Sequence, residues 1–546
     1  MGIRMDQKRC AVASKESLIR IFTVPEAPDS TLSKIESEIS SNLAGFLNEN
    51  IAAIEKPLHE IEKDFQTATI PEEPTFVSDY AQDIMEQLVA HSVHTAAPSF
   101  IGHMTSALPH FVLPLSKLMV GLNQNLVKIE TSKAFTPLER QVLGMMHHLA
   151  YGEDDSFYSK WMHSAKTSLG AFCSGGTVAN ITALWIARNR LLKADGDYKG
   201  IAAQGLISGM LHYGYKGLAV LVSERGHYSL GKTVDLLGIG RDNIVAIATG
   251  ENNKVDVDAM RKKAHELEAS GIKVMALVGV AGTTETGSID PLNEMADLSE
   301  ELGCHFHVDA AWGGSTLLSS NYRHLLSGIE RADSITIDAH KQMYVPMGAG
   351  LVLFKDPAAT DAIEHHAEYI LRKGSKDLGS HTLEGSRPGM AMLVHACLRV
   401  IGRKGYEMLI DRSIVKARTF ADMIKQDEDF ELISEPELCL LTYRYVPKEI
   451  QAKLKDADEE TKLDIYASLN RFTASMQKRQ REAGRSFVSR TRLTPAKYDH
   501  QPTVVFRVVL ANPLTSKAIL KDILAEQKEL AKTDPVFKKY LSKYMD

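Results

Sequence analysis

The stretch "DSITIDAHKQMYVPMGAG", residues 333–350, decides the fold class because it joins a buried-looking strand to two reactive side chains. The alternation of apolar and polar residues over 334–338 predicts a strand, and His340 and Lys341 follow it before a turn rich in proline and glycine. A lone lysine at a strand end is ordinarily solvated, because lysine is rarely buried without a partner. The rest of the chain has to show whether Lys341 is a solvated lysine or a lysine that reacts with a ligand.

Alternating strands and helices surround this segment. Short apolar runs with strand character recur between stretches of helical periodicity. The runs cover residues 218–223, 273–280, 305–310, 334–338 and 350–354. This alternation predicts an α/β domain over residues 96–385, in which helices flank a mainly parallel sheet. Ligands of such sheets bind at the carboxyl ends of the strands, so the functional residues are expected there.

The two flanking regions have different patterns. Residues 1–95 are polar and helical, and one apolar stripe there repeats at helical spacing, with Ser30 or Thr31 as its N-cap. The stripe consists of Leu32, Ile35, Ile39, Leu43 and Leu47. It predicts a surface helix or a helix that packs on a partner subunit, and residues 70–76 are expected to be a linker without helix.

Residues 386–546 predict a small α+β domain. It begins with helix and contains the strands "LCLLTYRYV", 438–446, and "TVVFRVVLA", 503–511. A highly charged helical stretch lies between the two strands, and its composition favours a solvated face or an insertion.

Composition limits the class of protein. The chain has 546 residues and a formal net charge of −6, and no basic block marks a nucleic-acid surface. No run of about 18 apolar residues indicates a membrane span, and the start lacks the apolar core of a signal peptide. The cysteines are few and scattered, without a CxxC pair: Cys10, Cys173, Cys304, Cys397 and Cys439. We therefore expect a protein of the reducing cytoplasm without a nucleic-acid, membrane or metal partner.

Gly175, Gly176 and Thr177 precede a helical pattern and form a candidate anion site. A helix N-terminus offers free backbone N–H groups, a positive dipole end and here a hydroxyl, which suits a phosphate group. An ordinary helix cap is the alternative. No lysine follows in the GxxxxGK[ST] pattern, which argues against a nucleotide-binding P-loop.

His227 follows one apolar strand, and Asp309 lies where another apolar strand stops. His227 is either a structural hydrogen bonder or a ligand-binding group, and no second metal ligand has suitable spacing around it. Asp309 is either a cap or the partner of a buried cation, and the small Ala310 and Ala311 leave space beside it for a flat ligand.

Four successive strand ends, in chain order, thus offer a phosphate cradle, a histidine, an aspartate and Lys341. Pyridoxal phosphate needs all four groups. Its phosphate suits the helix N-terminus, its flat ring stacks on an imidazole, and its pyridine nitrogen keeps a proton beside a carboxylate. A lysine amine condenses with its aldehyde, which gives Lys341 a chemical role.

The chain also resembles a known family, the group II pyridoxal-dependent decarboxylases of fold type I. The similarity covers about residues 95–515 and rests on "FCSGGTVAN", "SERGHYS", "VAGTTETGSIDP", "HVDAAWGG", "DSITIDAHK" and "LEGSR" in the family's order. The resemblance implies a pyridoxal phosphate enzyme that decarboxylates an amino acid. It further implies a homodimer with active sites at the subunit interface.

The resemblance also implies roles for individual residues. Lys341 binds the cofactor covalently, Asp309 pairs with the pyridine nitrogen and His227 stacks on the ring, and these three form the catalytic set. The remaining implied cofactor contacts are Gly175, Gly176, Thr177, Thr284, Ala311, Asp338 and His340.

The resemblance implies an acidic substrate, with L-aspartate ahead of L-glutamate and cysteine sulfinate. Arg507, in "FRVVLANP", matches an arginine that relatives use to hold the distal carboxylate, and its alternative is a structural ion pair. Arg387, in "GSRPG", is a second candidate with the same alternative. The expected product from aspartate is β-alanine, a pantothenate precursor, and from glutamate γ-aminobutyrate.

The residue that returns a proton to the substrate stays open. Segment 371–387 lacks the tyrosine that many relatives carry there, and it leaves His381 or the preceding Tyr369. A histidine in such a loop is expected to face solvent more often than a ligand. Other functions also stay open: an aminotransferase, an aromatic amino acid decarboxylase, or a binding protein without activity.

Overall fold

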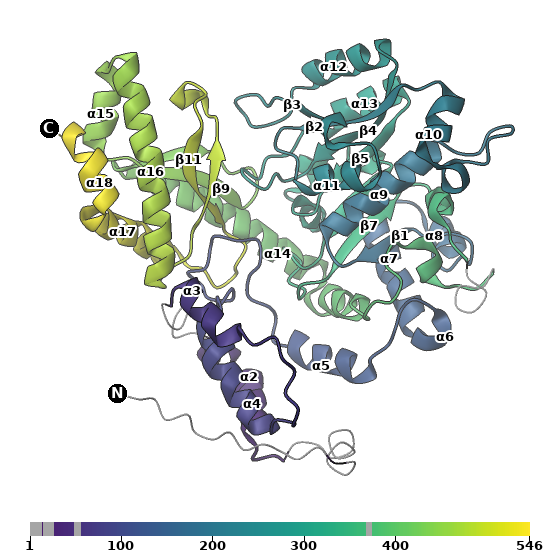
Figure 1. The fold of residues 1–546 in the computed structure, drawn as a ribbon, viewed down its shortest axis with the longest axis horizontal. Coiled ribbons are helices and arrows are strands. Elements are labelled where there is room, and N and C mark those ends of the chain that lie inside the picture. Colours follow the sequence, from purple (N-terminus) through teal and green to yellow (C-terminus); the bar gives the residue numbers. More distant parts are fainter. Residues whose placement is uncertain (1–13, 15–26, 48–55, 367–373, 546) are drawn as a thin grey trace.

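The computed structural model describes residue 14 and residues 27–47, 56–366 and 374–545. Figure 1 shows a large domain built on one sheet, a smaller domain built on another, and a helical arm near the N-terminus that lies below both. The candidate site lies in the large domain, at the strand ends of its sheet.

The large sheet has seven strands in the order β1-β7-β6-β5-β4-β2-β3. Strands β6, β5, β4, β2 and β3 run parallel, whereas β7 is antiparallel to both β1 and β6. The bounds are β1 Gly170–Cys173, β2 Gly217–Ser223, β3 Ile244–Ile247, β4 Ile272–Val280, β5 His305–Asp309, β6 Ser334–Asp338 and β7 Gly350–Phe354. The expected α/β class with a mainly parallel sheet is confirmed.

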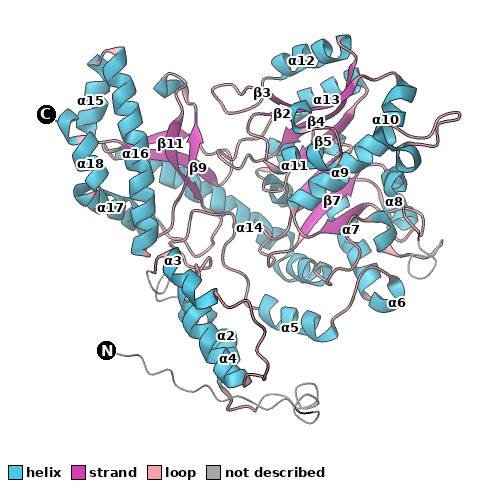
Figure 2. Cartoon of the chain, in the orientation of Figure 1, coloured by secondary structure: helices cyan, strands magenta, loops and turns pink. Residues whose placement is uncertain are grey.

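Helices cover both faces of this sheet, which explains the apolar runs in its strands (Figure 2). A strand buried on both faces has apolar side chains on each side, and Val274 through Val280 of β4 are buried without interruption. The flanking helices are α7 Phe135–Tyr151, α9 Gly176–Leu191, α10 Ile201–Tyr213, α11 Ser229–Leu236, α12 Val257–Ala269 and α13 Leu292–Leu302. Because the sheet is packed on both faces, the side chains at its strand ends are held in fixed positions.

All five strands predicted from the sequence are present, but β1 and β3 were not predicted as strands. Each of these two is only four residues long, which gives a weak periodic signal. The expectation of four successive strand ends was also wrong, because β3 and β4 lie between His227 and Asp309 in the chain.

The smaller domain has an antiparallel sheet in the order β10-β11-β9-β8. Its strands are β8 Phe430–Ser434, β9 Leu440–Tyr445, β10 Ser489–Leu493 and β11 Thr503–Val509. Its helices are α14 Ala391–Gln426, α15 Lys448–Asp456, α16 Glu459–Ala483, α17 Lys517–Thr533 and α18 Pro535–Tyr540. Strands β9 and β11 confirm the two predicted strands, whereas β8 and β10 were not expected.

Helix α16 corrects the interpretation of the charged stretch as a solvated face or insertion. It buries a stripe of side chains at helical spacing and packs on β11. The buried apolar residues of that stripe are Ile465, Leu469, Phe472 and Met476. The many charges lie on the opposite face, so the stretch is an amphipathic core helix.

The N-terminal arm contains the predicted helix as α2, Thr31–Leu47. The hydroxyl of Ser30 accepts a hydrogen bond from the amide of Ser33 at 3.2 Å, so Ser30 is the N-cap. Residues 66–76 contain no helix, in agreement with the expected linker. The side chains of Leu43 and Leu47 lie outside the described part of the chain. The remaining helices are α3 Leu58–Ile61, α4 Val77–Asp83, α5 Val112–Leu122, α6 Ile129–Ser132 and α8 Asp155–Trp161.

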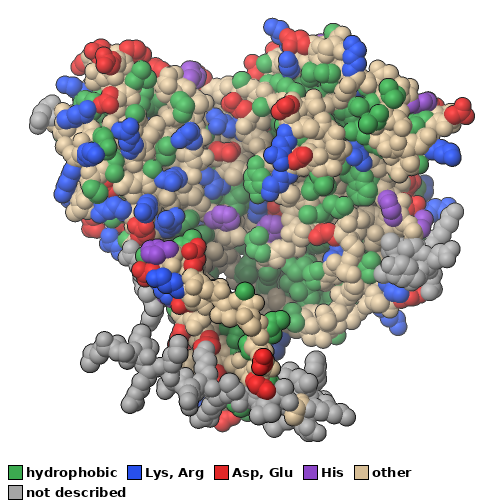
Figure 3. All heavy atoms as spheres, in the orientation of Figure 1, with side chains coloured by type: hydrophobic (Ala, Val, Ile, Leu, Met, Phe, Trp, Pro, Cys, Tyr) green, Lys and Arg blue, Asp and Glu red, His purple; other side chains and the backbone are tan. Residues whose placement is uncertain are grey.

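Acidic and basic side chains are interspersed over the face seen in Figure 3, without a large patch of one sign. Within the described residues, no helix is both long enough and apolar enough to cross a membrane. Cys173, Cys304, Cys397 and Cys439 are free thiols, and Cys10 lies outside the described residues.

Candidate active site

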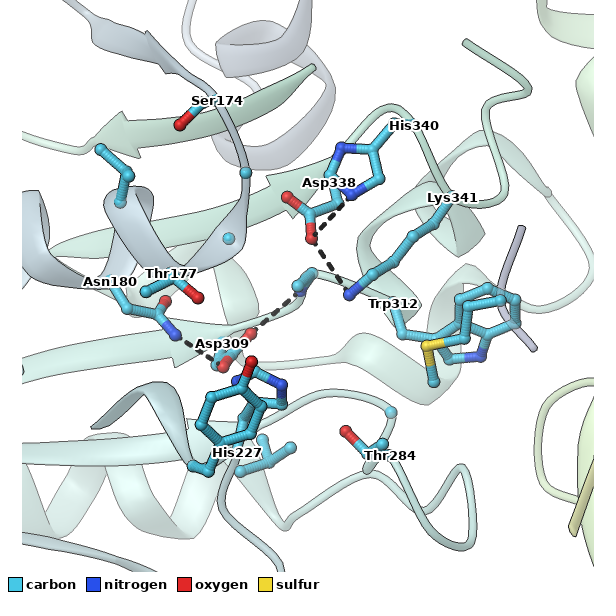
Figure 4. Close-up of a pocket in the computed structure, with 18 of the residues that line it drawn as sticks. Ser174, Thr177, Asn180, His227, Thr284, Asp309, Trp312, Asp338, His340 and Lys341 are labelled. Carbon is cyan, nitrogen blue, oxygen red and sulfur yellow. Dashed lines mark hydrogen bonds and ion pairs between the residues drawn. The ribbon is translucent and has the colours of Figure 1, made fainter. Parts of the chain in front are cut away.

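One pocket of about 380 Å³ lies at the carboxyl ends of the large-sheet strands. Its wall includes the start of α9 and the ends of β2, β5 and β6. Figure 4 shows that His227, Asp309 and Lys341 point into the same space. All cofactor contacts expected from the sequence line this pocket: Gly175, Gly176, Thr177, His227, Thr284, Asp309, Ala311, Asp338, His340 and Lys341.

The start of α9 forms one end of the pocket, and two glycines allow it to approach the strands. A Cβ added to Gly176 would lie 2.9 Å from an Asp338 carboxylate oxygen and 3.3 Å from the Ala311 Cβ. A Cβ added to Gly350 of β7 would lie 2.7 Å from the Gly175 backbone. Side chains larger than glycine would therefore push the helix N-terminus, with its anion-binding N–H groups, away from the site.

Asp309 is held in place by hydrogen bonds from two directions. Its Oδ2 accepts from Asn180 Nδ2 at 2.9 Å, and its Oδ1 accepts from the Ala311 amide at 3.2 Å. Asn180 is itself fixed, because its Oδ1 lies 3.1 Å from His307 Nε2. Burial lowers the pKa of His307 to about 4, so its imidazole is neutral and donates to Asn180. The chain of contacts orients the Asp309 carboxylate before any ligand binds.

Lys341 follows β6 in a tight turn and pairs with Asp338. Its Nζ lies 3.0 Å from Asp338 Oδ2, and its amide donates to the Asp338 carbonyl at 3.2 Å. His340 lies beside the pair, with Nε2 3.7 Å from the same carboxylate and Nδ1 3.1 Å from the Ala349 carbonyl. The Lys341 side chain is only 21% exposed, so the ion pair explains how this lysine is held inside the protein.

His227 points into the pocket beside Asp309 (Figure 4). Its Nδ1 lies 2.8 Å from the Ser229 hydroxyl, which also accepts from Asn180 Nδ2 at 3.1 Å. Burial, together with the positive charge of Lys341, lowers the pKa of His227, while Asp309 opposes the shift. A neutral imidazole at neutral pH is suited to contact with a flat ring rather than to ion pairing.

Loop 281–289 brings Thr284 to the pocket. A β-bridge between Ala281 and Ile289 joins the two ends of the loop. The Ile289 amide also donates a hydrogen bond to the Glu437 carboxylate of the small domain at 3.0 Å. Arg507 of β11 also holds the loop, because its Nε donates to the Thr284 carbonyl. The small domain therefore positions this wall of the pocket.

Three predicted residues lie outside the pocket lining, namely Arg387, His381 and Arg507. Arg387 is buried in an ion pair with Glu139 of α7 and does not line the pocket. His381, which was expected to face solvent, is 1% exposed and also lies outside the pocket lining. Tyr369 lies outside the described residues. Arg387 therefore has the structural ion pair that was its alternative interpretation.

The sequence interpretation did not single out several lining residues. They are His103, Met104, Ser174, Asn180, Arg225, Tyr228 and Trp312. Asn180 follows Gly176 by four residues, so helical periodicity could have placed it on the pocket face of α9. His103 comes from a segment far away in the chain, and no local pattern indicates that it reaches the site.

The pocket chemistry fits pyridoxal phosphate. The start of α9 offers an anion site, Asp309 offers an oriented carboxylate, and Lys341 offers an amine in the same space. Asp338 Oδ1 is buried and has no hydrogen-bond partner within the described residues, so the pocket still contains an acceptor that a ligand can use. In the described part of the chain, no group of three or more potential metal ligands occurs.

Comparison with known proteins gives one consistent family. The model of the pyridoxal-dependent decarboxylase conserved domain matches residues 57–446. The chain is 65% identical to an aspartate 1-decarboxylase of Aliivibrio fischeri over 528 residues, 97% of this chain and 96% of the relative. It is 27% identical to the cysteine sulfinic acid decarboxylase of Rattus norvegicus, over 81% of this chain and 84% of the relative.

Solved structures show the same fold. The crystal structure of mouse CSAD superposes with a TM-score of 0.77 at 24% identity, covering 91% of this chain and 98% of that one. Oryza sativa TDC with PLP and tryptamine superposes with a TM-score of 0.77 at 19% identity, covering 94% of this chain and 100% of that one.

Proposed function

Because this chain belongs to the pyridoxal-dependent decarboxylases, we propose that it removes the α-carboxylate of L-aspartate and releases β-alanine and carbon dioxide. One observation carries the choice of substrate: 65% identity to an aspartate 1-decarboxylase extends over 97% of the chain. The enzyme class and the cofactor follow from the family, whereas the roles of individual residues are part of the proposal.

Four groups would hold the cofactor. The N-terminus of α9, with Gly176 and Thr177, would bind the phosphate, and Lys341 would bind the aldehyde covalently. Asp309 would keep a proton on the pyridine nitrogen, and His227 would cover the ring face. Pyridoxal phosphate supplies an electron-withdrawing ring that stabilises the negative charge left on the α-carbon when carbon dioxide leaves.

The protein residues prepare this chemistry in three ways. Asn180 and the Ala311 amide orient the Asp309 carboxylate, so no reorganisation is needed when it meets a protonated nitrogen. The Asp338 carboxylate lies 3.0 Å from Lys341 Nζ and holds the lysine side chain in the pocket, where its amine would meet the cofactor aldehyde. Burial excludes water around both carboxylates and strengthens their electrostatic effect.

A second candidate substrate is L-cysteine sulfinate. It is favoured by the similarity to the rat cysteine sulfinic acid decarboxylase, at 27% identity over 81% of this chain. L-glutamate, with γ-aminobutyrate as its product, remains the third acidic candidate. All three substrates carry a second acidic group, so each requires a positively charged side chain in the pocket.

Assembly as a cytoplasmic homodimer is also part of the proposal. The N-terminal arm exposes large apolar side chains that a second copy of the chain could cover. Among them are Tyr80 and Leu88, which are 58% and 47% exposed, and the neighbouring Val93 at 48%. The domain limits proposed from the sequence are 1–95, 96–385 and 386–546. Sedimentation or light scattering of the holoenzyme would test the dimer.

The substrate is tested by carbon dioxide release from a panel of amino acids: L-aspartate, L-glutamate, L-cysteine sulfinate and L-tryptophan. We expect kcat/KM to be highest for aspartate. A higher value for glutamate or cysteine sulfinate would change the ranking only, whereas a higher value for tryptophan would refute an acidic-substrate enzyme.

A further inference from the structure

Arg225 places a positive charge in the pocket wall. It lies on the turn between β2 and α11, two residues before His227, and lines the pocket. Strand β2 pairs with β4, and β4 leads into the loop that carries Thr284. The Arg225 side chain is only 12% exposed. A guanidinium stays charged throughout the physiological pH range, so this part of the wall is permanently cationic.

The protein itself satisfies this guanidinium poorly. The carboxylate of Glu224 lies 3.9 Å from Arg225, at the limit of an ion pair. The same Glu224 oxygen already accepts from the hydroxyl and the amide of Thr249, at 2.7 Å and 3.3 Å. Arg225 Nε is buried and has no hydrogen-bond partner within the described residues. A ligand that accepts a hydrogen bond from the guanidinium would satisfy this buried donor.

Arg507, the expected substrate arginine, is engaged differently. Its Nε donates to the Thr284 carbonyl, and one Nη donates to the Gly102 carbonyl at 3.3 Å and the Ser489 hydroxyl at 3.4 Å. Its guanidinium therefore joins the Thr284 loop to two other segments. It is not among the residues that line the pocket.

Glu285 lies next to Thr284 and is the counter-charge to both arginines. Its Oε2 is buried without a hydrogen-bond partner among the described residues. Burial raises the pKa of Glu285, and the charges of Arg225 and Arg507 oppose this shift. Among the described residues, neither Glu224 nor Glu285 makes a close ion pair with Arg225, so a carboxylate on a ligand would complement this guanidinium.

We infer that Arg225 binds the distal carboxylate of the acidic substrate, and that Arg507 is a positioning residue that holds the Thr284 loop. The inference rests on the proposed function, since only an acidic substrate has such a group. The planar fork of a guanidinium binds a carboxylate through two parallel hydrogen bonds. Arg225 would thereby select acidic over neutral amino acids of the same size.

The test uses the holoenzyme with L-aspartate and L-2-aminobutyrate, in which a methyl group replaces the distal carboxylate. In Arg225→Met we expect kcat/KM for aspartate to fall about 30- to 100-fold, mainly through KM, as for loss of a hydrogen-bonded charge. The value for 2-aminobutyrate should not fall, so the preference for aspartate should collapse. Arg225→Lys should restore part of the preference for aspartate, because lysine restores the positive charge but not the two parallel hydrogen bonds of a guanidinium.

Arg241→Met is the matched control. Arg241 is 71% exposed, pairs with Asp235 and lies outside the pocket lining, so its loss should leave both substrates unchanged. Binding of succinate, measured by calorimetry, gives a readout that does not depend on turnover. We expect Arg225→Met and Arg225→Gln to weaken succinate binding about 30-fold or more, while each still binds the cofactor.

The proposed function and the role of Arg225 can be refuted separately. If wild-type enzyme does not prefer aspartate or another acidic amino acid over 2-aminobutyrate, the proposed function is wrong. If it does, and Arg225→Met keeps both the wild-type preference and the wild-type affinity for succinate, then the assignment of Arg225 alone is overturned.

Discussion

At the cofactor end of the pocket, both oxygens of Asp309 accept hydrogen bonds, and Lys341 is paired with Asp338 at 3.0 Å. Arg225, at the proposed substrate end, and Glu285, next to the pocket residue Thr284, each have a buried side-chain atom, Nε and Oε2, without a hydrogen-bond partner among the described residues. The protein thus completes most contacts of the first end in advance and leaves the second end partly unsatisfied. We interpret this difference as preorganisation for a resident cofactor and a reserved site for a ligand that comes and goes.

Removal of Lys341 should have the largest effect, because it deletes the proposed covalent attachment. We expect Lys341→Ala to lower kcat for aspartate by about 10⁴-fold or more, measured as carbon dioxide release. Lys263→Ala on α12 is the control, since Lys263 is an exposed lysine outside the pocket. Near wild-type turnover by Lys341→Ala would show that Lys341 is not needed for the reaction, which would contradict the proposed cofactor end of the pocket.

Asp309→Asn should have the second largest effect. The substitution keeps the shape and the acceptor oxygen but removes the charge that holds a proton on the pyridine nitrogen. We expect cofactor to remain bound, by its visible absorbance, while kcat falls about 10²- to 10³-fold, the scale seen when one electrostatic stabiliser is removed. A variant with normal kcat would show that this carboxylate only supports the structure.

Asn180→Ala sharpens the comparison, because Asn180 acts through Asp309 and does not need to touch the substrate. The change removes the hydrogen-bond partner of Asp309 Oδ2 and that of His307 Nε2, at about 1–3 kcal/mol, so we expect kcat to fall about 10- to 100-fold. KM for aspartate should change little, and this split between kcat and KM separates positioning from binding. An equal loss in KM would indicate a general disturbance of the pocket instead.

The smallest predicted effect concerns Asp290, at the base of the Thr284 loop. It accepts from the amides of Val255 and Val280, both at 2.9 Å, and burial raises its pKa from 3.8 to about 6. Because the folded state holds this proton more tightly than the unfolded state, stability falls as pH rises from about 4 to about 6. The full linkage corresponds to at most about 3 kcal/mol.

Asp290→Asn removes this titration. We therefore expect the Tm of wild type relative to Asp290→Asn to be a few °C lower at pH 7 than at pH 4.5. The measurement is thermal unfolding of both holoenzymes across this range. A difference that does not change with pH would mean that Asp290 titrates normally.

The sequence predicted well which strand-end residues would meet in one pocket. Lys341 and Asp309 follow strands with clear apolar runs, and the carboxyl ends of such strands meet at one edge of the sheet. The glycines before α9 were equally visible, because a helix start has a local signature. Each of these signals lies within a few residues of the group it identifies.

The substrate end was less predictable, because its features depend on contacts between distant segments. Arg507 looked free to bind a substrate, yet it donates to the carbonyls of Gly102 and Thr284. Arg387 pairs with Glu139, 248 residues away, and no local pattern indicates that partner. His381 belongs to a turn that tertiary packing buries.

Contacts between distant segments also explain the errors in the predicted fold. Strands β1 and β3 are too short to give a periodic signal. Pairing with β7 and β2 stabilises them as strands, and the sequence does not show this pairing. The charges of α16 outnumbered its apolar stripe in composition, although the stripe has helical spacing and covers β11. Composition was a poor guide there, and periodicity was the better one.

The central claim is that Lys341 binds the cofactor at the strand ends of the large sheet. Reduction of the holoenzyme with borohydride, followed by peptide mapping, tests it most directly. We predict that the pyridoxyl group is found on the peptide that contains Lys341. A pyridoxyl group on Lys232 or on any other lysine would contradict the account.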